Sequence, residues 1–165
     1  MGLYQAHQIQ RRSNTPSLTA AQLIDVIAHF ENEHKESQTR FRNYLAICFL
    51  AVLALRRNEL VGLKWTDIDF QASTVNVYQK GGGYKLLPIA PKLLNKLTEY
   101  KNAYPTVDYV FSPVRNTVTG NLNKPINTNY IYDLVTKTVF LVTKGGRATP
   151  HSFRKSFIEI ALNST

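Results

Sequence analysis

The sequence is poor in cysteine and in long apolar runs. Its single cysteine, Cys48, excludes an intrachain disulfide and a zinc site built on several cysteines, and it favours a reducing compartment. The longest apolar run, residues 44–55, has twelve residues, whereas a membrane-spanning helix needs about 20. The N-terminus has no basic start followed by an apolar stretch, so no targeting signal is visible. These absences predict a cytoplasmic protein, located at the nucleoid if it binds DNA.

Acidic residues are also scarce, above all in the second part of the chain. The 165 residues hold 20 Lys and Arg against 11 Asp and Glu, a formal net charge of +9. Residues 1–69 have 8 basic and 7 acidic side chains, and residues 70–165 have 12 basic and 4 acidic. Lysines that only keep a surface soluble explain this excess as well as a polyanionic partner does. Because no basic amphipathic helix with an aromatic face is present, nucleic acid is favoured over a membrane surface.

Length and composition predict one globular domain after a short polar segment. Hydrophobic residues make up 44% and charged residues 19% of the chain. Residues 1–16 are polar and end in Asn-Thr-Pro, so we expect a linker or arm there and a domain over residues 17–165. The pattern of the domain indicates a mixed fold that is mainly α, with a small antiparallel β-hairpin or sheet.

Hydrophobic periodicity gives the order of the elements. A capping box of Thr19 and Gln22 opens a first helix, in which Leu23, Ile24, Ile27 and Phe30 recur at helical spacing. The second helix, residues 40–55, is apolar almost all round and should therefore be central. Shorter signals predict helices at 56–61, 91–100, 127–142 and from Thr149 through Ile158 towards Leu162, strands at 75–79 and 84–89 joined by three glycines, and a short strand at 109–111.

Residues 149–154, Thr-Pro-His-Ser-Phe-Arg, contain the first candidate for chemistry. Thr149 suits the N-cap position of a helix and Pro150 its first turn. His151 and Arg154 are three residues apart, so they share one helix face close to free backbone amides, an arrangement that binds anions. A capping histidine and a surface arginine explain this pair equally well when it is considered alone.

A second candidate follows the central apolar helix. Arg56 needs a partner there, because a charge next to a core is costly when it is unpaired. Glu59, three residues on, can provide one, which would be a purely structural role. A phosphate held by the guanidinium group is the functional alternative.

The hairpin contributes two lysines, Lys80 and Lys85, on either side of its glycines. Lysines at such positions often only protect a sheet edge. In combination, however, Arg56, Lys80, His151 and Arg154 are what a phosphoryl-transfer site needs: arginines for the non-bridging oxygens, and a Lys or His for protons.

The order of these motifs resembles the catalytic domain of the tyrosine recombinases, the phage-integrase family. Residues 54–69 resemble the family's first-arginine box, residues 77–81 resemble its lysine-bearing hairpin, and residues 149–154 resemble its His-x-x-Arg box. The resemblance covers about residues 17–165, and three motifs in the same order make it specific. It implies a site-specific recombinase or integrase that cuts and rejoins DNA through a 3′-phosphotyrosyl intermediate.

The resemblance also implies a role for each matching residue. Arg56 and Arg154 would clamp the scissile phosphate, Lys80 would protonate the leaving 5′ oxygen, and His151 would assist proton transfer. Glu59 would orient the arginine site. No metal or other cofactor is implied. Three further residues, Arg57, Lys85 and Lys155, are expected to contact DNA, and Arg57 or Lys85 could stand in for Arg56 or Lys80.

The sequence departs from the family pattern after the His-x-x-Arg box. No tyrosine follows Tyr132, whereas the family's nucleophile is a tyrosine on a later helix. We therefore expect a C-terminally incomplete catalytic domain with no nucleophile of its own, inactive when alone. Lys155 stands where the family often has a second histidine. The expected partner is double-stranded DNA, on which the intact protein would form a homo-oligomer.

Two other functions stay open at this point. A non-catalytic DNA-binding module derived from an integrase would keep the basic surface and would bind with an affinity that falls steeply with salt. A metal-dependent nuclease would need clustered carboxylates. Only Asp67 and Asp69 are close neighbours, and their positions suit the end of one element and the start of the next.

Overall fold

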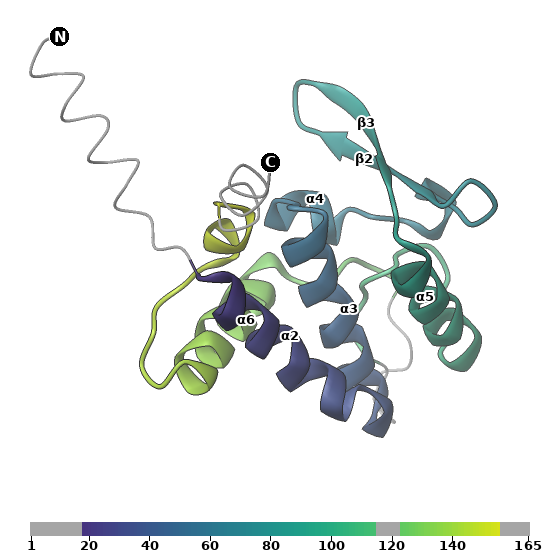
Figure 1. Ribbon diagram of the computed structural model, residues 1–165. Coiled ribbons are helices and arrows are strands. Elements are labelled where there is room, and N and C mark those ends of the chain that lie inside the picture. The colour runs from purple at the N-terminus through teal and green to yellow at the C-terminus, as the bar shows by residue number, and fades with distance from the viewer. Residues whose placement is uncertain (1–17, 115–122, 156–165) are drawn as a thin grey trace, which may run out of the picture.

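The computed structural model describes residues 18–114 and 123–155. The predicted linker at residues 1–16 and the part of the last predicted helix beyond Lys155 lie outside the described residues. Helices form the body of the molecule, and a three-stranded antiparallel sheet stands at one side of it (Figure 1). The predicted fold class, mainly α with a small antiparallel sheet, is confirmed.

Four helices make up most of the body. Helix α3 (Gln38–Val52) lies in the middle, as its apolar sequence predicts, and every residue from Phe41 to Ala51 is buried. Helix α2 (Ala20–Glu33) packs on one side of α3 with α6 (Thr128–Val142) beside it, and α5 (Pro91–Ala103) packs on the other side (Figure 1).

The ends of the first two helices follow from local hydrogen bonds. Thr19 and Gln22 form the predicted capping box: the Gln22 N–H donates to Thr19 Oγ1 over 3.1 Å, and the Thr19 N–H donates to Gln22 Oε1 over 3.0 Å. Helix α3 begins two residues before the predicted Arg40, because Ser37 Oγ accepts the Arg40 N–H and acts as the cap. It ends before Ala54, whose left-handed backbone (φ 54°) stops the helix.

One apolar residue of α2 departs from the expected pattern. Ile24 is 64% exposed, although it belongs to the apolar set that the periodicity singled out. The buried face instead runs through Leu23, Val26 and Phe30, which are spaced three and four residues apart. Ile24 is one position off that face, so its side chain turns outwards.

The sheet consists of β1 (Ile68–Asp69), β2 (Thr74–Gln79) and β3 (Gly83–Pro88) in that order. Both long strands were predicted, but β1 was not, because two residues carry no alternation that could be recognised. In the turn between β2 and β3, Gly81 and Gly83 have φ values of 76° and 74°, which side chains disfavour. The inner face of the hairpin packs against the body of the molecule, and its turn lies on the side where α4 (Arg57–Val61) lies (Figure 1).

The predicted strand at residues 109–111 is wrong. The chain there forms only an isolated antiparallel bridge between Tyr109 and Lys64. The N–H of Trp65 donates to the Asp108 carbonyl, and the N–H of Val110 donates to the Leu63 carbonyl. The segment therefore ties the end of α4 to the loop after α5 without lengthening the sheet.

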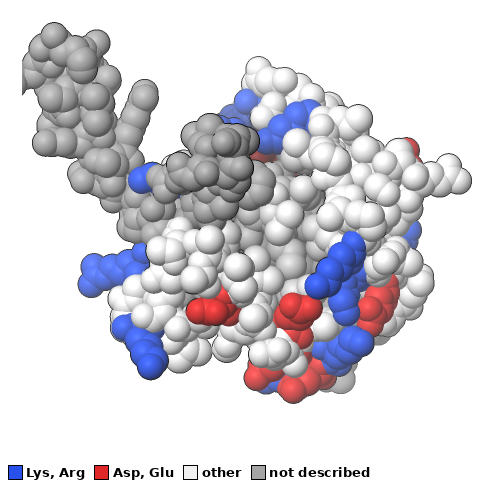
Figure 2. Space-filling model, viewed as in Figure 1, with Lys and Arg blue, Asp and Glu red and all other residues white. Residues whose placement is uncertain are grey.

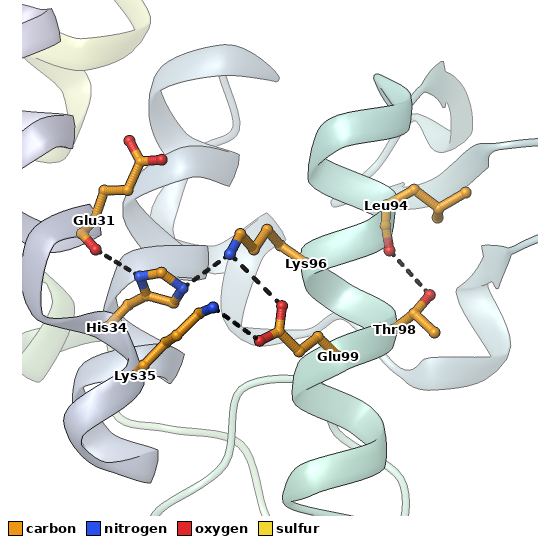
Figure 3. A network of polar contacts seen from close by, with 7 residues as sticks. All are labelled: Glu31, His34, Lys35, Leu94, Lys96, Thr98 and Glu99. Carbon is orange, nitrogen blue, oxygen red and sulfur yellow. Dashed lines mark hydrogen bonds and ion pairs between the residues drawn. The ribbon is translucent and has the colours of Figure 1, made fainter.

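A network of polar contacts joins α5 to the single 3₁₀ turn η1 (His34–Glu36), as Figure 3 shows. The buried ring of His34 contacts the Glu31 carbonyl through Nδ1, and its Nε2 lies 3.1 Å from Lys96 Nζ. An ammonium group can only donate, so Nε2 accepts and the proton of the neutral ring is on Nδ1. Lys96 also pairs with Glu99 at 3.6 Å. Within the described parts of the chain, no helix is long and apolar enough to span a membrane.

Candidate functional site

One small pocket brings together the two arginine-bearing motifs of the sequence. It has a volume of about 200 Å³ and lies where the start of α4 meets the helical turn at residues 150–155. Three guanidinium groups and one imidazole around so small a volume suit an anion of the size of a phosphate group. The pocket is lined by Leu55, Arg56, Arg57, Asn58, His151 and Arg154.

Arg56 occupies the residue just before α4, in an extended conformation. Its backbone N–H donates to Glu59 Oε1 over 2.8 Å, which fixes the start of the helix. Its side chain is 55% exposed. The sequence predicted that Arg56 directly follows the apolar helix, but α3 already ends at Val52. The arginine side chain therefore lines the pocket without being buried.

Glu59 lies below the arginine with only 5% of its side chain exposed. Its Oε2 is 3.3 Å from Lys85 Nζ and 3.9 Å from Arg56 Nη1. This oxygen is buried and has no hydrogen-bond partner within the described part of the chain. A buried carboxylate is costly without compensating charge, and the nearer of the two cations is Lys85. The predicted Arg56–Glu59 pair therefore exists, but the hairpin lysine makes the closer contact.

The His-x-x-Arg residues lie on the turn that starts at Pro150, as predicted. The N–H of Thr149 donates to Ser152 Oγ over 3.0 Å, and the N–H of Ser152 donates to the Thr149 carbonyl over 2.9 Å. Ser152 and Phe153 face the core, whereas His151 is exposed and Arg154 is half-buried. The turn thus presents the histidine and the arginine to the pocket while its other face anchors it.

The other predicted site residues differ in their relation to this pocket and in their exposure. Arg57 lines it, and its guanidinium carbon lies 5.1 Å from the ring centroid of Tyr132 on α6. Lys155 is half-buried and directly follows Arg154. Lys80 is exposed in the hairpin turn and is not among the residues that line the pocket.

Two contacts of the site were not predicted from the sequence. The bond between Lys85 and Glu59 joins residues of two different elements, and the Arg57–Tyr132 contact joins α4 to α6. Spacing rules such as i to i+3 could suggest the Arg56–Glu59 pair, but no local signal could suggest either of these. The structure therefore places Lys85 against Glu59, on the inner side of the hairpin.

The two signs of charge are unevenly distributed over the face drawn in Figure 2. In Figure 2 the acidic side chains gather towards the lower right and alternate there with basic ones, whereas the top, where the hairpin and α4 lie in Figure 1, shows Lys and Arg with little acidic surface. Ion pairs between described residues of α2, α3, α5 and η1 include Lys35–Glu99, Arg40–Glu33 and Lys96–Glu99. The top of this view therefore shows fewer acidic partners for its basic side chains than the lower part does.

A larger hollow of about 690 Å³ is lined by α6 and by Gly146–Thr149, the segment that leads to His151. Its wall includes Tyr132, Phe140 and Leu141 of α6, and the last two are 58% and 66% exposed. Lys137 and Arg147 also line it, but most of its surface is apolar, so it suits a phosphate less well than the arginine pocket does. Among the residues described, no three His, Cys, Asp or Glu side chains gather closely enough to hold a metal ion.

Comparison with known proteins identifies the family. The model of the phage integrase family matches residues 16–165, nearly the whole chain. The protein therefore belongs to the phage integrase family, and the fold described above is that of a tyrosine recombinase catalytic domain.

Two curated relatives have the same description. The tyrosine recombinase XerC of Pediococcus pentosaceus is 28% identical over 131 residues, which cover 78% of this chain and 44% of that protein. The tyrosine recombinase XerC of Mesorhizobium japonicum is 29% identical over 149 residues, covering 90% of this chain and 47% of that protein. The chain thus spans about half the length of the curated relatives it matches.

Solved structures show the same fold. The crystal structure of XerA recombinase superposes with a TM-score of 0.72 at 22% identity, covering 92% of this chain and 52% of that one. A lambda integrase dimer bound to a COC′ core site gives a TM-score of 0.63 at 15% identity, covering 91% and 53%. At these identities the likeness concerns the fold alone.

Proposed function

We propose that this protein is the DNA-cutting domain of a site-specific recombinase. The observation that carries the proposal is the pocket in which Arg56, His151 and Arg154 meet. In this reaction a tyrosine oxygen attacks a phosphodiester, a 3′-phosphotyrosyl bond forms, and the bond to the 5′ oxygen breaks. A 5′ hydroxyl of another strand then attacks the phosphotyrosine and releases the tyrosine. The substrate is double-stranded DNA.

The pocket suits the charge that develops in this reaction. Arg56 and Arg154 hold the non-bridging oxygens, where negative charge increases in the transition state. The leaving 5′ oxygen needs a proton, which Lys80 supplies from the hairpin turn, and His151 accepts or returns the proton on the nucleophile's side. Arg57, held against Tyr132, and Lys155 contact the flanking phosphates.

The nucleophile comes from outside the described pocket. Among the described residues that line it there is no tyrosine, and no tyrosine follows Tyr132 in these 165 residues. It is therefore supplied by another part of the whole protein or by a second copy. Assembly as a homo-oligomer on DNA is part of this proposal, and the lambda integrase neighbour is a dimer on its core site.

The test uses the protein expressed from the whole reading frame that contains these residues. It is incubated with a duplex that carries a nick close to the target phosphate. Cleavage then releases a short strand that ends in the new 5′ hydroxyl, and because this strand diffuses away, the covalent complex cannot revert. We expect a protein–DNA adduct that survives denaturing electrophoresis and forms equally well with a metal chelator. Absence of an adduct under conditions where the protein binds the same DNA would contradict the proposal.

A non-catalytic DNA-binding module is the second candidate, and what favours it is that the described residues lining the pocket include no tyrosine. Such a module would bind DNA with a steep salt dependence and form no adduct. Arg56→Ala and Arg154→Ala would then weaken binding no more than Lys124→Met, a change at an exposed lysine outside the pocket. A selective loss at the two arginines would count against the module.

A further inference from the structure

The hairpin has one charged attachment close to its turn. Lys85 on β3 pairs in register with Val77 on β2, and Val77 is fully buried. Because cross-strand partners share a face of the sheet, Lys85 also points to the inner side, towards α4. Its side chain is only 26% exposed, and Nζ lies 3.3 Å from Glu59 Oε2 and 3.5 Å from Oε1. The lysine therefore spans the space between the hairpin and the helix that carries Arg56.

On the opposite face of the hairpin, no ion pair with another described residue is formed. Tyr78 and Tyr84 form an edge-to-face pair there, with ring centroids 5.3 Å apart, and the two side chains are 58% and 61% exposed. At the turn, a Cβ added to Gly81 or Gly83 would meet no atom within 4 Å. The described contacts of the turn region with the helices thus depend on the inner face, where Lys85 is the charged residue nearest to Lys80.

Glu59 connects this attachment to the arginine site. Its Oε1 accepts the backbone N–H of Arg56 over 2.8 Å, and the same carboxylate lies against Lys85. The carboxylate is buried, so the attraction to the ammonium group is screened less by water than at the surface. One carboxylate thus holds the start of α4 with one oxygen and faces the hairpin with the other.

We propose that Lys85 is a positioning residue: its ammonium group ties the β2–β3 hairpin to the buried carboxylate of Glu59 and so fixes where Lys80 stands relative to Arg56. This inference rests on the proposed function for the meaning of the Lys80–Arg56 geometry. It gives Lys85 an internal role instead of the DNA contact that the sequence suggested.

The first experiment measures the position of the hairpin turn directly and needs no DNA. Spin labels are attached to cysteines introduced by Gly82→Cys in the turn and Ala21→Cys on the exposed side of α2. A Cβ at Gly82 meets only the Gln79 side chain at ordinary contact distance, and the native Cys48 is buried. Electron–electron resonance then gives the distribution of distances between the two labels.

We expect a narrow distribution for the unchanged chain and one at least twice as wide for Lys85→Met, which keeps the aliphatic stem and removes the charge. Lys85→Arg should restore the narrow distribution, and Lys124→Met should leave it unchanged. The single variant leaves a buried carboxylate unpaired, which could destabilise the fold. The double variant Lys85→Met with Glu59→Gln removes both charges and avoids this effect. Its distribution should also be wide, and equal widths in all variants would overturn the proposal.

A second readout links the hairpin to the chemistry. If Lys85 positions the proton donor, the Lys85→Met variant should cleave ordinary DNA at least tenfold more slowly than the unchanged protein does. DNA with a sulfur at the 5′-bridging position should be cleaved less than twofold more slowly, because a thiolate leaves without a proton. Equal slowing on both substrates would overturn the proposal. If even the unchanged protein cleaves neither substrate, the proposed function fails, while the spin-label distances still decide whether Lys85 holds the hairpin.

Discussion

Arg56 and Arg154 line the same pocket, although one precedes α4 and the other lies on the turn that begins at Pro150. Two guanidinium groups on one phosphate stabilise the charge of the transition state more than that of the bound substrate. We therefore expect Arg56→Ala and Arg154→Ala each to slow cleavage by about 10²- to 10³-fold. DNA binding should fall only a few-fold, measured by fluorescence anisotropy at constant salt.

The cleavage rate in this first test is the single-turnover rate of adduct formation with protein in excess. Lys124→Met is the matched control, because it removes one positive charge from an exposed position outside the pocket. It should leave the rate within about twofold of the unchanged protein. If the arginine variants lost binding and cleavage in the same proportion, the two residues would serve only to hold DNA.

Lys80 is expected to act on the leaving group. Lys80→Met should slow cleavage of ordinary DNA by about 10²-fold or more, which is a usual contribution of a general acid. The same variant should cleave a 5′-bridging sulfur substrate at nearly the normal rate. Arg56→Ala, by contrast, should slow the cleavage of both substrates by the same factor. A Lys80 defect of equal size on both substrates would assign the lysine to binding.

Much of the fold could be predicted because its signals are local. The Thr19–Gln22 capping box, the apolar α3 and the glycine turn of the hairpin each depend on residues a few positions apart. What the sequence missed depends on the tertiary structure. Ile24 lies off the buried face of α2, and β1 becomes a strand only because β2 pairs with it.

The functional site, too, was predictable where its residues form local motifs and unpredictable where they meet through the fold. The arginine box and the His-x-x-Arg box were recognisable as motifs, and the structure places residues of both in one pocket. The hairpin motif suggested Lys80 as the proton donor and Lys85 as a DNA contact that could stand in for it. The fold adds a difference that the motif did not suggest, because Lys85 lies against Glu59 while Lys80 stays exposed. A pairing between distant segments leaves no spacing pattern that could reveal it.

Arg42 is expected to be important for stability. It is only 4% exposed, and no ion pair with a carboxylate is formed by it within the described residues. Its Nη1 donates to the Ser112 carbonyl over 3.2 Å, and Nε and Nη2 donate to Asn43 Oδ1. Arg42→Ala leaves these buried acceptors without donors, so we expect a loss of about 2 kcal/mol or more in the free energy of unfolding, measured by urea denaturation.

Tyr130→Phe provides the comparison for this variant. It removes the hydroxyl that accepts from Asn43 Nδ2 over 3.0 Å but keeps the ring, which lies 5.0 Å from the Arg42 guanidinium carbon. We expect a loss of about 1 kcal/mol, the usual net value of one hydrogen bond. Equal losses for both variants would show that the arginine contributes no more than its neighbour's hydroxyl.

Stability is expected to fall at alkaline pH because of three buried groups. Burial raises the pKa of the Cys48 thiol from 9.0 to about 12, and it also raises the pKa values of Tyr44 and Tyr100 above their ordinary 10.0. The unfolded chain releases these protons near the ordinary values, whereas the folded chain keeps them. Above about pH 9 the unfolded state therefore binds fewer protons, and the free energy of unfolding decreases as pH rises.

Urea midpoints measured at several pH values between about 7 and 10.5 test this prediction. The contribution from the three groups should be fully present at the lower end and should decrease progressively above about pH 9. Cys48→Ala removes one titrating group and leaves only a small cavity, so its midpoint should fall less steeply with pH than that of the unchanged chain. A midpoint that stays level or rises above pH 9 would show that these side chains ionise as readily in the folded protein as in the unfolded one.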